Sequence, residues 1–214
     1  MKLQTIIPIK NLNDAKKRLS TLLNEEKRKQ LSIYMIQDVF KSVSITSEIE
    51  EVIVVSPDLE VLNYAKTFGF KTILEKAQVG VNKAVKTAIS FCLKNRATST
   101  LILPADIPLI QPIDIKKIVE ATNNTQSVII TPSKRMDGTN ALLLSPPDVI
   151  HTSYDNSSYK VHEQNALNKK IPFIVIKLDS IMLDIDIPKD IEEFMMITSN
   201  TNTYRFLSKE IIKN

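Results

Sequence analysis

The sequence predicts an α/β protein with a mostly parallel central sheet and helices on both faces. Short runs rich in Ile, Val and Leu are apolar almost throughout, which is typical of strands that are buried on both faces. Longer amphipathic segments separate these runs, so that strand–helix–strand units recur along the chain. Because parallel strands need crossover connections, this alternation favours a sheet with right-handed helical crossovers.

Each element follows from its local pattern. The first helix is predicted to start at Asn24, whose side chain can cap it, with Glu25 and Glu26 adding negative charge to the first turn. An apolar stripe over residues 31–43 then faces the sheet. The remaining segments are predicted as strands at 3–9, 51–56, 71–75, 99–105, 127–132, 141–145 and 173–178, and as helices at 58–68, 82–95, 112–122, 159–169 and 188–197. Residues 199–214 are compatible with a loose tail or a short docking helix.

Size and composition limit the function classes. The chain has 214 residues, of which 43% are apolar, so we predict one ordered domain over 1–214. A net charge of +4 suits anionic ligands but is too small to predict nucleic acid as a partner. A single cysteine, Cys92, excludes a disulfide framework and a multi-thiolate zinc site. No apolar run reaches the ~18 residues of a membrane span and the start does not resemble a signal peptide, so we expect a cytoplasmic protein with no membrane partner.

Glycine is scarce. The chain has three, Gly69, Gly80 and Gly138, and it contains neither the Gly-rich turn of dinucleotide-binding proteins nor a Walker A loop. Binding of phosphates would therefore depend on lysine, arginine, a metal ion and helix ends.

Ligands of open parallel sheets bind beyond the carboxyl ends of the strands, so the residues after each strand are the candidates. After the first strand, Lys10, Lys16, Lys17 and Arg18 place four cations in one short loop. Lysine as a point charge and arginine as a bidentate fork suit a triphosphate. A solvated basic turn is the alternative.

Three aspartates are candidate metal ligands. Asp106 leaves a buried strand between two prolines, and carboxylate oxygens are natural ligands for Mg²⁺. Asp184 and Asp186 alternate along an extended segment, so they share a face, where two like charges favour a cation between them. The alternatives are a turn aspartate at 106, a helix cap at 186 and a solvated side chain at 184.

Two further segments are candidates for a small oxygenated ligand. Residues 137–138 signal a tight turn, after which Thr139 and Asn140 begin a new strand at the mouth of the sheet. A hairpin by itself explains this turn. Ser157 or Ser158 is the predicted N-cap of the next helix, where free amides can bind an anion or are simply capped.

The remaining candidates are weaker. Gly80 would let the backbone approach a flat ring and Asn82 could bind a base, although the same residues also describe an ordinary helix start. His162 is a secondary candidate, His151 has no evident partner, and Cys92 is most simply a core thiol.

Six blocks occur in a fixed order over residues 3–197: IPIKNLNDAKKRLSTLLNEEKRKQL, AQVGVNKAV, LILPADIPLI, DGTNALLLSPP, SSYKVHEQNA and LDIDIPKDI. In this order they resemble the 2-phospho-L-lactate guanylyltransferases of coenzyme F-420 biosynthesis. The resemblance implies a nucleotidyltransferase fold related to the GT-A glycosyltransferases. It also implies transfer of GMP from GTP to 2-phospho-L-lactate, with Mg²⁺ and release of pyrophosphate. Bacterial relatives use phosphoenolpyruvate, and the family suggests a homodimer.

The resemblance also implies roles by position. It places Mg²⁺ on Asp106, Asp184 and Asp186, the triphosphate on Lys10, Lys16 and Arg18, guanine near Gly80 and Asn82, and the phosphorylated acid on Thr139 and Ser158. The attacking phosphate oxygen is already ionised at neutral pH, so no protein base is needed. Catalysis then reduces to positioning and charge neutralisation.

One departure from the family pattern concerns the acid site. Relatives usually have aromatic-Gly-x-Gly-Ser before the helix, where this chain has Tyr154-Asp155-Asn156-Ser157-Ser158. We expect the Asp155 carboxylate to point away from a bound anion.

The alternative functions are a molybdopterin guanylyltransferase or cytidylyltransferase, whose openings are glycine-rich, or a catalytically silent nucleotide-binding protein.

Overall fold

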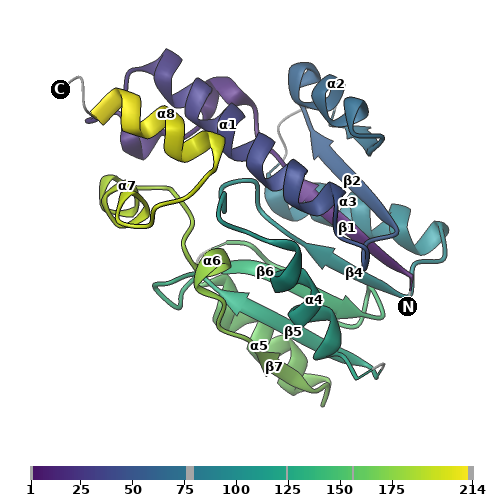
Figure 1. The fold of residues 1–214 in the computed structure, drawn as a ribbon. Helices are drawn as coiled ribbons and strands as arrows, with labels where there is room; N and C mark the ends of the chain where they lie inside the picture. The colour runs from purple at the N-terminus through teal and green to yellow at the C-terminus, as the bar shows by residue number, and fades with distance from the viewer. Residues whose placement is uncertain (1, 76–79, 124, 156, 212–214) are drawn as a thin grey trace.

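The computed structural model describes residues 2–75, 80–123, 125–155 and 157–211, and these form one seven-stranded sheet with helices around it (Figure 1). The strands are β1 (Leu3–Pro8), β2 (Glu51–Ser56), β3 (Lys71–Leu74), β4 (Ser99–Ile102), β5 (Ser127–Pro132), β6 (Thr139–Ser145) and β7 (Phe173–Val175). The helices are α1 (Glu25–Ser44), α2 (Leu59–Thr67), α3 (Val81–Lys94), α4 (Pro112–Glu120), α5 (Ser158–Asn168), α6 (Asp179–Met182), α7 (Pro188–Met195) and α8 (Asn202–Ile211). Two short 3-10 turns, η1 (Leu12–Asp14) and η2 (Lys17–Leu19), were not predicted.

The strand order is β3-β2-β1-β4-β6-β5-β7, and every neighbouring pair is parallel except those of β6. β6 runs antiparallel to β4 and β5. Its direction follows from the short turn 133–138, which cannot hold a crossover helix, so the chain must reverse. The prediction of a mostly parallel α/β sheet is confirmed.

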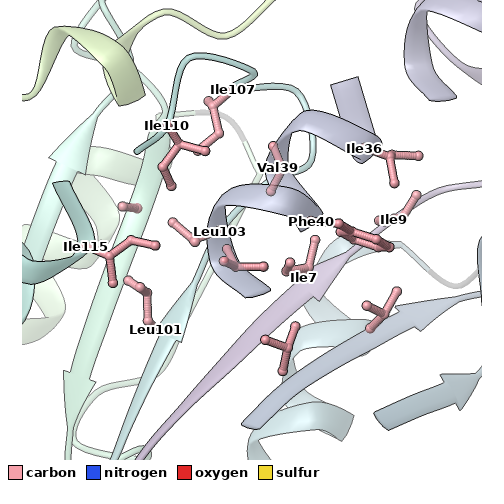
Figure 2. Close-up of a cluster of buried hydrophobic side chains, with 14 of the residues drawn as sticks. Ile7, Ile9, Ile36, Val39, Phe40, Leu101, Leu103, Ile107, Ile110 and Ile115 are labelled. Carbon is pink, nitrogen blue, oxygen red and sulfur yellow. The ribbon is translucent and has the colours of Figure 1, made fainter. Parts of the chain in front are cut away.

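One face of the sheet packs against α1, α2 and α4. Figure 2 shows Phe40 of α1 beside Ile7 of β1, and Ile115 of α4 beside Leu101 of β4, all within one buried cluster. Side chains in a strand alternate between the two faces, so the neighbours Ile6 and Ile102 belong to the opposite cluster, which is covered by α3 and α5. The predicted Asn24 cap of α1 is also confirmed, since its side chain accepts a hydrogen bond from the Lys27 N–H at 2.9 Å.

A third cluster lies outside the sheet and joins α1 to the C-terminal helices. Met35 of α1 packs there with Phe194 of α7 and Leu207 of α8, and α8 lies along α1 in Figure 1. The Asp38 carboxylate on α1 accepts hydrogen bonds from the Asn202 and Thr203 N–H groups, which fixes the start of α8. Of the two alternatives for residues 199–214, the structure therefore shows a docked helix over Asn202–Ile211, and residues 212–214 lie outside the described part of the chain.

Four predicted strands are shorter than expected. The run 99–105 is a strand only to Ile102, and the runs 3–9, 71–75 and 173–178 end at Pro8, Leu74 and Val175. Leu103 to Ala105 leave the sheet in a loop that carries Asp106. Among the described residues, no helix combines the length and apolar character needed to cross a bilayer.

Candidate functional site

A cavity of about 510 Å³ opens beyond the carboxyl ends of β1 and β4. Its lining combines the loop 8–18, the loop 104–106, Asp186, Thr139 and Tyr154 with part of α1. The fold thus brings the basic loop to the same place as two of the predicted acidic residues and one of the predicted acid-binding residues.

Two buried leucines shape the basic loop. Leu12 and Leu19 are buried in separate clusters, and the Leu12 N–H donates to the Asp58 carboxylate at 3.1 Å. Between them Lys16 takes a left-handed backbone conformation with φ of 52°. The apolar side chains are therefore held inside while the charged side chains between them line the cavity.

Lys16 is the central cation of the cavity. Its ammonium lies 2.6 Å from Asp106 Oδ2 and 3.6 Å from Asp186 Oδ1, and its side chain is only 10% exposed. Burial by itself would lower the pKa of Lys16, but the charges of Asp106 and Asp186 and the hydrogen bond to Asp106 outweigh it and raise the pKa. Lys16 is therefore charged and neutralises both carboxylates.

The other two predicted triphosphate residues line the same cavity. The Arg18 guanidinium donates to Asp186 Oδ2 at 2.9 Å from an exposed position, and Lys10 is exposed at the cavity wall. An ion pair as exposed as that of Arg18 adds little to stability. An anion in the cavity can therefore replace Asp186 as the partner of Arg18 at little cost.

A backbone contact brings the C-terminal acidic segment to Asp106. The Ile185 N–H donates to the Asp106 carbonyl oxygen at 3.0 Å. Leu183 and Ile185 are buried in the third cluster, so Asp184 and Asp186 project to the other side. Asp186 does not cap α7: the N-cap is Ile187, and Asp190 in the first turn accepts hydrogen bonds from the N–H groups of residues 186 and 187.

Asp184 is held by two residues of the β5–β6 region. The Asn140 amide donates to Asp184 Oδ1 at 3.0 Å, and the Arg135 guanidinium is 3.7 Å from Oδ2. Burial raises the pKa of Asp184, the charge of Asp106 raises it further, and the Asn140 hydrogen bond offsets part of the rise. Asn140 therefore orients an acidic residue and does not line the cavity itself.

Carboxylate oxygens are suitable ligands for a hard cation. Asp106 and Asp186 already point to one positive charge, the ammonium of Lys16. In the described part of the chain, however, no three His, Cys, Asp or Glu side chains are grouped closely enough to hold a metal ion. The ammonium of Lys16 lies where the two carboxylates meet.

The predicted acid-binding residues lie together. The Ser158 hydroxyl donates to Thr139 Oγ1 at 3.0 Å, and His162 Nδ1 is 3.1 Å from the same oxygen. Ser157 precedes α5 in a left-handed conformation and its side chain makes no capping bond. Ser158, the first residue of α5, therefore binds β6 through its hydroxyl, a contact that capping of the helix does not require.

Asn82 and Asp155 bind each other. The Asn82 amide donates to Asp155 Oδ2 at 2.9 Å, and its carbonyl oxygen accepts from the Tyr154 N–H at 2.6 Å. Both polar atoms of Asn82 therefore hold the loop 154–155. Gly80, with φ of 87°, borders a small hollow beside Lys10. Gln78 and Val79 of the predicted junction lie outside the described residues.

Sequence reasoning missed two residues near the site. Arg135 pairs with Asp184 and with Asp190, the latter at 3.2 Å, and Tyr154 forms part of the cavity wall. Arg135 follows the fifth predicted strand, so a search for cations at every strand end would have found it. Tyr154 carries no comparable signal because its role depends on tertiary packing.

Comparison with known proteins finds relatives that align over most of the chain. The chain is 33% identical to a 2-phospho-L-lactate guanylyltransferase of Methanobrevibacter smithii, over 95% of this chain and 88% of the relative. It is 32% identical to a phosphoenolpyruvate guanylyltransferase of Rubrobacter xylanophilus, over 89% and 92%.

Solved structures show the fold. A Desulfovibrio desulfuricans G20 protein named as a nucleotide-diphospho-sugar transferase superposes with a TM-score of 0.81 at 13% identity, covering 99% of this chain and 96% of that one. A cytidylyltransferase of Leptospira borgpetersenii superposes with a TM-score of 0.62 at 15% identity, over 100% and 95%. The nucleotidyltransferase fold that the resemblance implied is confirmed. The family model described as "Guanylyl transferase CofC like" matches residues 3–213, and the chain belongs to this family.

Proposed function

We propose that this chain transfers GMP from GTP to a small phosphorylated acid, 2-phospho-L-lactate or phosphoenolpyruvate, and releases pyrophosphate in coenzyme F-420 biosynthesis. One observation carries the proposal: Lys16 joins Asp106 and Asp186 in a cavity that also contains Thr139. A guanylyltransferase needs cations for a triphosphate, carboxylates for a metal ion and hydroxyl donors for an acid, and this cavity supplies all three.

In this mechanism the protein acts by position and charge. A phosphate oxygen of the acid, ionised because the second pKa of a phosphomonoester is near 6, attacks the α-phosphorus of GTP. A new P–O–P bond forms and the bond to pyrophosphate breaks. Lys10, Lys16 and Arg18 neutralise the triphosphate and the leaving pyrophosphate, which is the main requirement of phosphoryl-group transfer.

We propose Mg²⁺ as the cofactor, held by Asp106 and Asp186 with Asp184 beside them. Hard carboxylate oxygens are the ligands that Mg²⁺ prefers. Asp106 and Asp186 share the ammonium of Lys16 in the structure, so binding of the ion requires Lys16 to turn from them to the triphosphate. When bound, the ion supplies further charge neutralisation at the phosphates.

The proposed cellular location of the enzyme follows from its substrates. They are multiply charged and do not cross a bilayer, so we place the enzyme in the cytoplasm. A homodimer is proposed on the family resemblance alone.

The alternatives within the superfamily are less well supported. Cytidylyltransferases and molybdopterin guanylyltransferases have glycine-rich openings, whereas this chain opens with Pro8-Ile9-Lys10. The relatives that align over nearly the whole chain are named as guanylyltransferases. A catalytically silent protein is disfavoured because the acidic and basic residues of the cavity are all present.

A pyrophosphate-release screen tests the proposal. The four NTPs are each combined with 2-phospho-L-lactate, phosphoenolpyruvate and related phosphorylated acids, with and without Mg²⁺. We expect release only with GTP, Mg²⁺ and one of the first two acids, and mass spectrometry should detect the GMP adduct. Release with CTP in preference to GTP, or no release with any pair, would overturn the proposal.

A further inference from the structure

We infer that His162 is a positioning residue for the acceptor: it holds the Thr139 hydroxyl so that its proton points to the anionic group of the bound acid. The inference rests on the proposed function, because it assumes that Thr139 contacts the acid. It concerns three side chains of β6 and α5, Thr139, Ser158 and His162, which we call the hydroxyl network.

The direction of the hydrogen bonds in the hydroxyl network follows from one backbone group. The Ser153 N–H points at His162 Nε2 with a distance of 3.1 Å. A backbone N–H can only donate, so Nε2 must carry a lone pair and the ring proton must be on Nδ1. His162 Nδ1, 3.1 Å from Thr139 Oγ1, is therefore a donor to that oxygen.

Thr139 Oγ1 then accepts twice. The Ser158 hydroxyl also donates to it at 3.0 Å, which uses the second lone pair. A hydroxyl has two lone pairs and one proton, so the proton of Thr139 is the only group left for a further partner. Thr139 lines the cavity, and no described residue accepts this proton, so it is available to an anion there.

Burial and packing hold the imidazole in this state. His162 is fully buried, and the ring of Tyr154 meets it edge-on with centroids 5.3 Å apart. Burial, with a smaller contribution from the charge of His151, lowers the pKa of His162 to about 4. The ring is thus neutral at neutral pH, and a second ring N–H does not oppose the Ser153 N–H.

The spacing along α5 explains how one helix supplies both donors to Thr139 Oγ1. Ser158 and His162 are one turn apart, so both side chains lie on the helix face that meets β6. With Ser158 as the only donor, one lone pair of Thr139 Oγ1 would stay unused, and the hydroxyl could rotate to put its proton in that position instead of toward the cavity. With both donors in place, a single orientation satisfies the hydroxyl network.

The test substitutes His162 in the full chain and measures KM for each substrate. His162→Phe keeps a ring but removes both hydrogen bonds, and we expect KM for the acid to rise about tenfold, the loss of one hydrogen bond to a charged group. KM for GTP should stay within about twofold, since GTP does not contact the hydroxyl network. His162→Asn places an amide donor near the former Nδ1 and should restore most of the acid affinity.

A double-mutant cycle separates positioning from packing. In a Thr139→Val background the hydroxyl is gone, so adding His162→Phe should change KM for the acid by less than about twofold. His151→Phe is the matched control, because it makes the same replacement at an exposed histidine. Equal effects of His162→Phe with and without the Thr139 hydroxyl would overturn the inference.

A second readout does not depend on activity or on the stability of a variant. Long-range ¹H–¹⁵N NMR correlation of the wild-type chain should show His162 protonated at Nδ1 and unprotonated at Nε2. The opposite tautomer would overturn the inference. A wild-type chain that transfers GMP to no acid would overturn the proposed function. Normal wild-type transfer with unchanged acid KM in His162→Phe would overturn the role of His162 alone.

Discussion

Lys16 determines the charge balance of the cavity. Its ammonium offsets two carboxylates that would otherwise repel each other, and its raised pKa follows from that position. A buried cation with two acidic partners is costly to leave unpaired, so each substitution of a partner changes more than one interaction. The acidic residues are therefore best tested by changes that preserve volume.

Asp106→Asn should nearly abolish turnover while the chain still folds. The amide oxygen can still accept from Lys16, but the charge that we assign to a metal ligand is lost. We expect at least ~2–4 kcal/mol less transition-state stabilisation, comparable to the loss of one key electrostatic donor. The measurements are kcat at saturating Mg²⁺ and thermal unfolding, with the exposed Asp148→Asn as control. A kcat within a few-fold of wild type would argue against the metal role.

Lys10→Ala and Arg18→Ala should weaken the interaction with the triphosphate. Both side chains line the cavity from exposed positions, so their removal costs little stability. We expect a higher KM for GTP or a lower kcat, with no change of preference among acids. Lys94→Ala, at the exposed end of α3, is the control. Unchanged GTP kinetics in both variants would support the alternative interpretation, in which the loop is only a solvated basic turn.

The stability of the protein should fall in mild acid because of His162. Its pKa is about 4 in the folded chain against 6.5 in the unfolded one, so the unfolded chain binds more protons between these values. This contribution is fully present above pH 6.5 and is lost as the pH falls toward 4, by on the order of 3 kcal/mol. Urea unfolding at several pH values should show a shallower decline in His162→Phe than in His151→Phe. Parallel declines in the two variants would contradict the assigned pKa.

At the scale of elements, the turn between β5 and β6 and the start of α5 build the acceptor side of the cavity. Ser133 Oγ donates to Asp137 at 2.8 Å and accepts from the Gly138 N–H at 2.9 Å, so the turn is held by its own side chain. The Tyr159 N–H donates to the Asp137 carbonyl oxygen at 3.3 Å and ties α5 to the same turn. The position of Thr139 is thus set by two elements and not by its strand alone.

Ser158→Ala should weaken binding of the acid far more than that of GTP. It removes one of the two donors to Thr139 and the hydroxyl at the start of α5, where helix amides attract an anion. Asp155→Gly should be neutral or improve binding of the acid, because it removes a negative charge, while Asn82 still holds the loop through the Tyr154 N–H. Titration of 2-phospho-L-lactate and phosphoenolpyruvate against both variants measures this. Identical acid affinity in Ser158→Ala and wild type would place the acceptor elsewhere.

At the scale of the whole molecule, the C-terminal helices stabilise the wall of the site. α7 and α8 pack on α1, and the segment between α6 and α7 carries Asp184 and Asp186. The third cluster therefore connects the end of the chain to the acidic residues.

Leu207→Ala should destabilise the whole protein by about 2–4 kcal/mol, as large-to-small changes in a core do. Leu207 is 1% exposed within the third cluster. The exposed Leu167→Ala is the matched control and should change the free energy of unfolding by less than about 0.5 kcal/mol. Urea denaturation measures both, and equal values would mean that α8 adds little to the fold.

The sequence by itself determined the sheet, most helices and the composition of the site. Apolar runs identified the strands because a strand covered on both faces must be apolar along its length. Asn24 identified a helix start because its cap is a local interaction. The candidate cations and aspartates were identifiable because parallel strands bring their carboxyl ends to one edge.

Only the tertiary structure decided which of these side chains meet. Lys16 and Asp106 are 90 positions apart, and Asn82 and Asp155 are 73 apart, so no local pattern records either pair. The same holds for Arg135 beside Asp184 and for the hydroxyl network of His162. Local propensity depends on neighbours in the chain, whereas the place of β6 between β4 and β5, the docking of α8 and the partners of each polar group depend on packing between distant elements.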